Sequence, residues 1–151
     1  VSKHNPHIAG TYFTALFFLK NELNLNYYWN NIKKSYSCQK ALQNQEKLPL
    51  INPLSYIALT NYYKFVSINR KNKTGSENRK YFDKKLELNL FIEEIKFFNP
   101  DIIIFQGYSF RNKGLLNKLP KIKQIYIGPH PSYRGKRQPE YFVRKIKKFK
   151  N

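Results

Sequence analysis

Hydrophobic and polar positions in the first third of the chain predict one long helix followed by a loop. Leucines recur at the spacing of one helix face, which predicts a helix that begins at Tyr12 and continues to Trp29 or Lys34. The following stretch, residues 35–53, is polar and punctuated by prolines. We therefore expect a loop there, with at most a helical turn.

Short apolar runs farther along the chain predict buried parallel strands. Residues 56–60, 101–105 and 122–127 are each compact, apolar and followed by polar or turn-forming residues. Residues 1–4 would form the end of a further strand, most of which would precede Val1.

Helical stripes separate these runs. A stripe over 88–95 lies opposite charged positions and stops at Asn99-Pro100, which predicts a helix that packs on a sheet. Residues 115–119 predict a short helix closed by Pro120. A final helix is predicted over 142–149, with Phe142, Val143, Ile146 and Phe149 on one face. Residues 67–80, rich in Asn, Lys, Arg and Ser, are expected to be solvated and mobile.

The alternation of strands and helices indicates a parallel α/β fold with right-handed crossovers. The 151 residues, 41% of them hydrophobic, can bury one core, so we expect a single domain over residues 1–151.

The charge balance points to a polyanionic partner. The chain carries 28 Lys and Arg against 9 Asp and Glu, for a formal net charge of +19. Such an excess causes self-repulsion unless a polyanion is near, and nucleic acid is the leading candidate. The alternative is that an AT-rich genome inflates Lys and Asn, so that part of the charge reflects codon supply.

Cysteine content and apolar run length restrict the class of protein. The one cysteine, Cys38, excludes an intrachain disulfide and a four-thiolate zinc or iron–sulfur site within this chain. No apolar run approaches the roughly 18 to 20 residues needed to cross a bilayer, and the first residues lack the apolar core of a signal peptide. We expect an intracellular protein, cytoplasmic or nuclear, that is monomeric and has no membrane partner.

Candidate chemistry gathers where the predicted strands end. The stretch 125–135 passes from an apolar strand into a loop rich in Pro and Gly, which would display His130 at the carboxyl end of the strand. Asn5 and Asn61 also follow predicted strands. In a parallel sheet these three residues would converge on the edge where ligands bind.

The motifs resemble the uracil-DNA glycosylase superfamily across nearly the whole chain. Their order is Asn5-Pro6 with Ala9-Gly10, Thr60-Asn61 after an apolar strand, the stretch 99–107, and His130-Pro-Ser132 with Arg134-Gly135. An Asn in the first motif with a His in the last is similar to the single-strand-selective branch. The resemblance implies a three-layer α/β/α fold with a central four-stranded parallel sheet.

The resemblance also implies a DNA glycosylase that flips a uracil or related damaged base out of DNA and hydrolyses its N-glycosidic bond without cofactor or metal. Asn5 would position the attacking water, and His130 would donate a hydrogen bond to the departing base, whose developing negative charge a fixed donor stabilises. Asn61 would read the base edge while Phe13 or Tyr12 stacks on its ring.

The same resemblance places DNA contacts in the segment after His130. Ser132 would bind a backbone phosphate, and Tyr133 or Arg134 would fill the gap that the extruded base leaves in the duplex. Lys136 and Arg137 would add to a rim that faces the phosphates of single- or double-stranded DNA.

A second hypothesis is a catalytically silent nucleic-acid-binding module. Family members usually open the first motif with Gly and follow its Pro with Gly or an aromatic residue. Here Lys3-His4 precede Asn5, and His7 follows Pro6. These departures favour the silent module, whereas the set of Asn5, Asn61 and His130 favours the enzyme.

Overall fold

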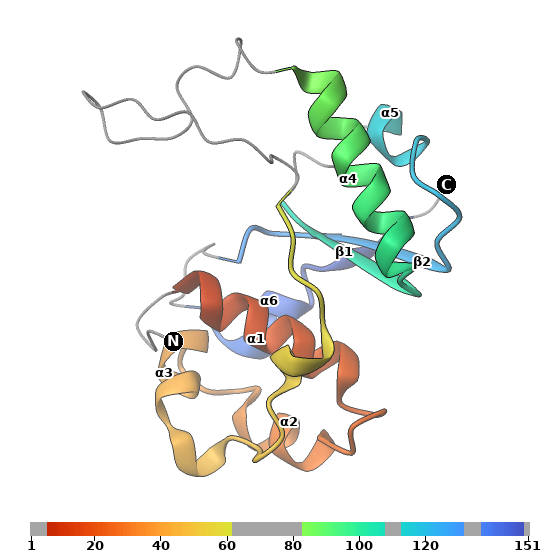
Figure 1. Ribbon diagram of the computed structural model, residues 1–151. Coiled ribbons are helices and arrows are strands. Elements are labelled where there is room, and N and C mark those ends of the chain that lie inside the picture. Colours follow the sequence, from red (N-terminus) through yellow and green to blue (C-terminus); the bar gives the residue numbers. More distant parts are fainter. Residues whose placement is uncertain (1–5, 62–82, 108–112, 132–136, 150–151) are drawn as a thin grey trace, which may run out of the picture.

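The computed structural model describes residues 6–61, 83–107, 113–131 and 137–149, in which helices cover both faces of a small sheet (Figure 1). The α-helices in these ranges are α1 (Pro6–Leu19), α2 (Asn26–Ile32), α3 (Cys38–Gln43), α4 (Lys84–Phe98), α5 (Lys113–Leu116) and α6 (Pro139–Val143). The 3₁₀ helices η1 (Gln45–Lys47) and η2 (Pro53–Tyr56) follow α3. The strands are β1 (Ile102–Gln106), β2 (Gln124–Gly128) and β3 (Lys147–Lys148).

The sheet has the order β1-β2-β3 and is mixed. β1 and β2 are parallel, with Gln106 opposite Gly128, and β3 is antiparallel to β2, with Lys147 opposite Ile127. The predicted fold class, which was built on a central four-stranded parallel sheet, is therefore wrong. In the described ranges the fold is instead rich in helices, with six α-helices and three strands.

The strand predicted over 56–60 is absent from the sheet. Tyr56 ends η2, and the following residues have no strand partner and are largely exposed, Leu59 at 67%. A short apolar run indicates hydrophobicity but does not specify a pairing partner, which is why sequence pattern alone assigned a strand here.

The C-terminal helix is shorter than predicted, because its second half joins the sheet. α6 ends at Val143, and Lys147–Lys148 then pairs with β2, after which the Phe149 amide donates to the Ile125 carbonyl at 2.8 Å. The free edge of β2 offers backbone groups that need partners, and this pairing satisfies them. Ile146 remains buried, as its helical spacing also predicted.

Helix α1 packs against α3, α6 and η2 and begins earlier than predicted. Pro6 is its first residue, a position that proline favours because its missing N–H has no helical partner there. Residues 9–16 are all buried, so the helix is covered on every side. It ends at Leu19, and Asn24, in a left-handed conformation with φ of 55°, separates it from α2.

The stretch 35–53, predicted as a loop, contains α3 and η1. Ser37 caps α3, because its hydroxyl accepts a hydrogen bond from the Lys40 amide at 3.1 Å. The cap and the buried Cys38, Ala41 and Leu42 explain a short helix in a segment that pattern alone described as polar.

Helix α4 confirms its prediction. Asp83 caps it by accepting from the amides of Lys85 and Leu86, and Asn99, with φ of 42°, ends it in the left-handed region before Pro100. Its buried side chains Phe91 and Ile95 pack against the sheet, as expected.

Alternating side chains of β1 connect the two halves of the core. Ile103 and Phe105 pack with Phe91 and Ile95 of α4, while Ile104 packs with the cluster built around α1, α2, α3 and α6. This period of two places Gln106 on the α1 side of the sheet, at the carboxyl end of the strand.

Two predictions lie outside the described residues: the strand at residues 1–4 and the solvated character of the segment 67–80.

Candidate functional site

The loop after β2 displays one imidazole between two anchored prolines. Pro129 and Pro131 are buried, whereas His130 between them is exposed. Because the prolines fix the backbone and pack into the protein, the His130 side chain projects from a rigid support. The predicted display of His130 at the carboxyl end of a strand is therefore present.

Helix α1 packs directly on this loop at Gly10. A Cβ atom at this position would come within 2.8 Å of the Pro131 Cα, and even closer to its carbonyl oxygen. Only glycine allows the first turns of α1 to approach the loop so closely. The Ala9-Gly10 pair noted in the sequence thus brings the start of α1 to the end of β2.

The contact brings two histidines together. The ring of His7, in the first turn of α1, lies with its centroid 5.2 Å from that of His130, in an edge-to-face arrangement with an interplanar angle of 72°. Burial, and then the positive charge of His130, lower the pKa of His7 from its ordinary value. The neutral form of His7 is therefore more favoured than that of an exposed imidazole.

Gln106 fixes α1 to the sheet through the two turns that follow His7. Its amide nitrogen donates to the Thr14 hydroxyl at 2.9 Å, and its amide oxygen lies 3.4 Å from the Thr11 hydroxyl. Thr11 in turn donates to the His7 carbonyl at 3.0 Å. Gln106 was not among the predicted site residues. Its position at the end of an apolar strand was the available signal.

Tyr12 and Phe13, the expected base-stacking residues, lie in the core. Phe13 is fully buried and Tyr12 is 6% exposed, and their rings pack edge to face. Burial also raises the pKa of Tyr12 to about 12. In this structure neither ring offers a face to a base, so their placement corresponds to core packing.

Asn61 is exposed and lies at the end of the segment that follows η2. The preceding Thr60 donates from its hydroxyl to a Glu94 carboxylate oxygen of α4 at 2.5 Å, which holds this segment against α4. The structure gives no direct contact between Asn61 and His130.

Five predicted site residues lie outside the described ranges: Asn5, Ser132, Tyr133, Arg134 and Lys136. Arg137 is described and half-buried. Its carbonyl accepts from the Cys38 amide at 2.8 Å, and its guanidinium carbon lies 5.3 Å from the centre of the Tyr141 ring.

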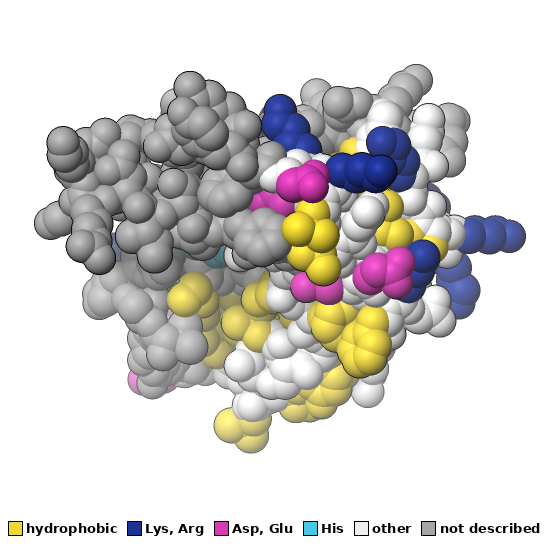
Figure 2. Space-filling model, turned by 45° about the horizontal axis from the view of Figure 1, so that its top comes forward, with side chains coloured by type: hydrophobic (Ala, Val, Ile, Leu, Met, Phe, Trp, Pro, Cys, Tyr) yellow, Lys and Arg dark blue, Asp and Glu magenta, His cyan; other side chains and the backbone are white. Residues whose placement is uncertain are grey.

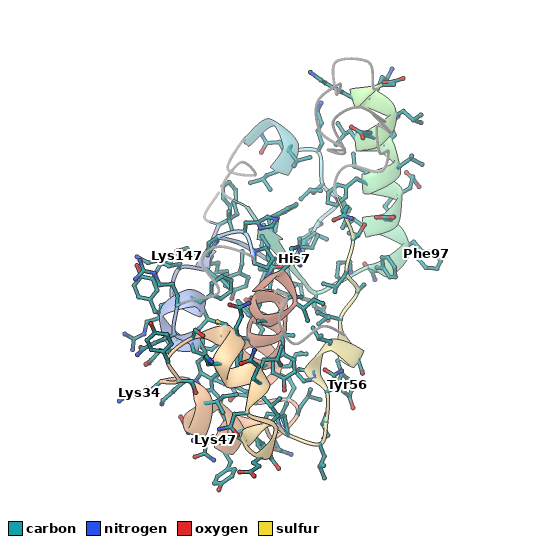
Figure 3. The ribbon with its side chains drawn as sticks, turned by 90° about the vertical axis from the view of Figure 1, so that its left-hand side faces the viewer. His7, Lys34, Lys47, Tyr56, Phe97 and Lys147 are labelled. Carbon is teal, nitrogen blue, oxygen red and sulfur yellow. The ribbon has the colours of Figure 1, made fainter. Side chains whose placement is uncertain are left out.

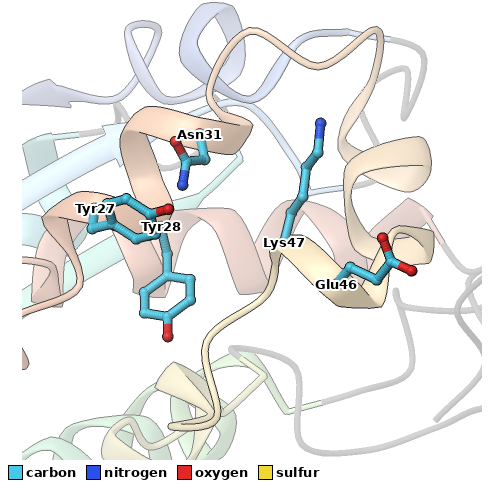
Figure 4. Close-up of a pocket in the computed structure, with 5 residues that line it drawn as sticks. All are labelled: Tyr27, Tyr28, Asn31, Glu46 and Lys47. Carbon is cyan, nitrogen blue, oxygen red and sulfur yellow. The ribbon is translucent and has the colours of Figure 1, made fainter.

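A surface pocket of about 300 Å³ lies elsewhere, between α2 and η1 (Figure 4). Tyr27, Tyr28, Asn31, Glu46 and Lys47 line it. None of these residues belongs to the predicted site, and the pocket is open to solvent with a largely polar wall.

Clusters of potential metal ligands and the cysteine were the other features of the described residues that could carry chemistry. No group of three or more His, Cys, Asp and Glu side chains there could hold a metal ion. Cys38 is buried, and this burial raises the pKa of its thiol to about 12. A protonated, inaccessible thiol is a poor nucleophile.

None of the helices in the described ranges has both the length and the apolar character that crossing a membrane requires.

The local arrangement can present a hydrogen-bond donor. An imidazole N–H on a rigid loop, next to a second imidazole and to the start of a helix, suits the stabilisation of developing negative charge.

In comparisons with known proteins, no family model, curated protein or solved structure matches the chain.

Proposed function

We propose that the protein is a monofunctional DNA glycosylase that hydrolyses the N-glycosidic bond of uracil, or of a related damaged base, in DNA. The observation that carries the proposal is the contact between His7 and His130, whose ring centroids lie 5.2 Å apart. It joins two motifs that are distant in sequence but would cooperate in one reaction.

The contact supports a common site for the two proposed catalytic residues. Asn5 precedes His7 by two residues, and two residues of chain span at most about 7 Å. We therefore propose that Asn5 and His130 act on the same base.

The proposed reaction uses water as the nucleophile. Asn5 orients a water molecule, whose oxygen bonds to the anomeric carbon as the bond from that carbon to the base nitrogen breaks. The electron pair of this bond leaves with the base, and the His130 N–H donates to the base oxygen on which negative charge develops. The proton that the water loses neutralises the departing base through solvent. Asn61 recognises the base edge, while Ser132, Tyr133, Arg134, Lys136 and Arg137 contact the DNA strand.

A strand-break assay tests the proposal. The protein is incubated with a single-stranded oligonucleotide that contains one uracil, and alkali then breaks the strand wherever a base has been lost. We expect breaks at the uracil position, and we expect Asn5→Ala and His130→Ala to suppress them. Asn117→Ala, which removes an exposed amide beyond α5, is the matched control and should retain activity. Breaks that survive both site substitutions would refute the assignment of these residues.

The second candidate function is a catalytically silent nucleic-acid-binding module. The burial of Tyr12 and Phe13 favours it, because a glycosylase needs an aromatic face for the flipped base and neither ring supplies one in this structure. Tight DNA binding without base release from any modified oligonucleotide would support the silent module and contradict the glycosylase.

A further inference from the structure

Cationic side chains around α6 lie on the side of the molecule opposite α4. Figure 3 shows Lys34 and Lys147 along one side and Phe97 of α4 along the other. Five of the nine acidic residues belong to α4 or its flanks: Asp83, Glu87, Glu93, Glu94 and Asp101. On the face that carries α4, acidic side chains stand among Lys, Arg and apolar groups (Figure 2). The excess of positive charge is thus unevenly distributed.

We define the basic strip as Lys34, Arg137, Lys145 and Lys147 together with the aromatic Tyr141. Glu140, the acidic residue of α6, already pairs with Arg144 at 2.8 Å. Its charge is therefore largely compensated, and the strip keeps a net positive charge.

Tyr141 organises the cations of the strip. Tyr141 as a residue is 41% exposed, and the Lys145 ammonium lies 4.9 Å and the Arg137 guanidinium carbon 5.3 Å from the centre of its ring. The negative face of an aromatic ring attracts cations, which holds two like charges near each other on one exposed platform. An anion between these cations would relieve their repulsion.

Helix α6, which carries Tyr141 in the basic strip, is held firmly in the fold. Pro139, Phe142 and Val143 of α6 are buried, and backbone bonds from Cys38 to Arg137 and from Glu140 to Lys33 tie its start to α2 and α3. A platform held in place in this way loses little conformational entropy when it binds a ligand.

The strip also adjoins the candidate site. Lys147 pairs opposite Ile127, which precedes His130 by three residues on the same strand and loop. A polymer bound at His130 could therefore continue across β3 and α6.

We propose that the basic strip binds the single-stranded DNA that flanks the target base, with an unpaired base stacking on Tyr141 as the cations over its ring move to contact phosphates. Exposed aromatic rings between cations are the recurring solution for single strands, because every base offers a π face, whereas duplex bases are already stacked on each other. The inference rests on the proposed function only in taking DNA as the polyanion.

Binding of an oligothymidine of about 12 nucleotides, a length in the range of single-strand site sizes, tests the strip. Its dissociation constant is measured by fluorescence anisotropy at low salt. The ligand contains no uracil, so the result does not depend on base excision. We expect Tyr141→Leu to weaken binding about 10-fold, whereas Tyr141→Phe, which keeps the ring, should bind within about 2-fold of the parent.

The matched control is Tyr56→Leu. Tyr56 is 57% exposed and lies away from the strip (Figure 3), so its replacement should leave affinity unchanged. Circular dichroism verifies that each variant folds. A duplex of the same length should bind Tyr141→Leu and the parent equally. The proposal is overturned if Tyr141→Leu binds oligothymidine like the parent, or if it loses duplex and single-strand affinity to the same extent.

If oligothymidine binding depends on Tyr141 but uracil is never released, the strip stands and the glycosylase fails. If uracil is released but Tyr141→Leu has no effect on oligothymidine binding, the glycosylase stands and the basic strip fails.

Discussion

The titration of His7 makes the free energy of unfolding of the protein depend on pH. Burial and the nearby positive charge of His130 lower the pKa of His7 below the ordinary 6.5. The unfolded chain therefore binds this proton more readily than the folded chain does. Above pH 6.5 both forms are neutral and His7 has no effect, but the free energy of unfolding should decrease as the pH falls below 6.5 toward the folded-state pKa.

Substitution of His7 by Asn should remove this dependence. We expect urea denaturation between about pH 5 and 8 to give a free energy of unfolding that falls less steeply toward acid in His7→Asn than in the parent. Any constant difference between the two proteins at pH 8 reflects lost ring packing and leaves the comparison of slopes intact. Parallel pH profiles would contradict the lowered pKa.

Gln106 makes a second residue-scale prediction. Gln106→Met preserves the size of the side chain but removes its hydrogen bond to Thr14, so we expect a loss of about 1 kcal/mol in the free energy of unfolding. Gln138→Met is the control, because Gln138 is exposed and makes no side-chain capping bond. Equal effects of both substitutions would show that the clamp between β1 and α1 contributes nothing.

The packing of helix α1 on the loop after β2 brings His7 and His130 together. This packing is most easily disrupted at Gly10, where the two backbones approach most closely. In an open helix Gly→Ala gains about 1 kcal/mol from helix propensity. At Gly10 a methyl group would instead overlap the Pro131 backbone, and overpacking of this kind typically costs about 1–3 kcal/mol or more. The clash opposes the propensity gain and exceeds it.

We therefore expect Gly10→Ala to lower the free energy of unfolding by about 1–2 kcal/mol in chemical denaturation, after the propensity gain is subtracted. Gly114→Ala in the exposed start of α5 provides the comparison and should be neutral or stabilising. If Gly10→Ala is as stable as the parent, the close approach of α1 and the His130 loop is not present in solution.

Elements with strong local signals were predictable from sequence. Helix α4 has an apolar stripe, an Asp cap and an Asn-Pro stop, and the structure confirms it. The start of α1 was missed because Pro6 and Gly10 normally interrupt helices, whereas here proline occupies the first turn and glycine is required by a tertiary contact. The split of the C-terminal helix depends on the free edge of β2, which no local pattern reveals.

The candidate site was predictable in part for the same reason. Pro and Gly around His130 signalled a displayed imidazole, which the structure contains. The neighbouring His7 and the clamp by Gln106 depend on how α1 packs, which is tertiary information. Tyr12 and Phe13 carried the signal of helical periodicity, and this signal describes core residues equally well.

For the whole molecule, the positive charge predicts that affinity for DNA decreases as the salt concentration rises. If about five phosphates are contacted, the logarithm of the binding constant for oligothymidine should fall with the logarithm of salt concentration at a slope of about −3.5. Anisotropy titrations at several salt concentrations measure this slope. A slope near zero would instead favour the explanation of the basic composition by codon supply.

The central claim, that His130 stabilises the departing base, is tested most directly by single-turnover kinetics. With the protein in excess over a single-stranded oligonucleotide that contains one uracil, the rate of base release is compared between the parent and His130→Ala. The proposed mechanism predicts a rate about 100- to 1,000-fold lower in the variant, with unchanged affinity for the oligonucleotide. Equal rates for the two proteins would contradict it.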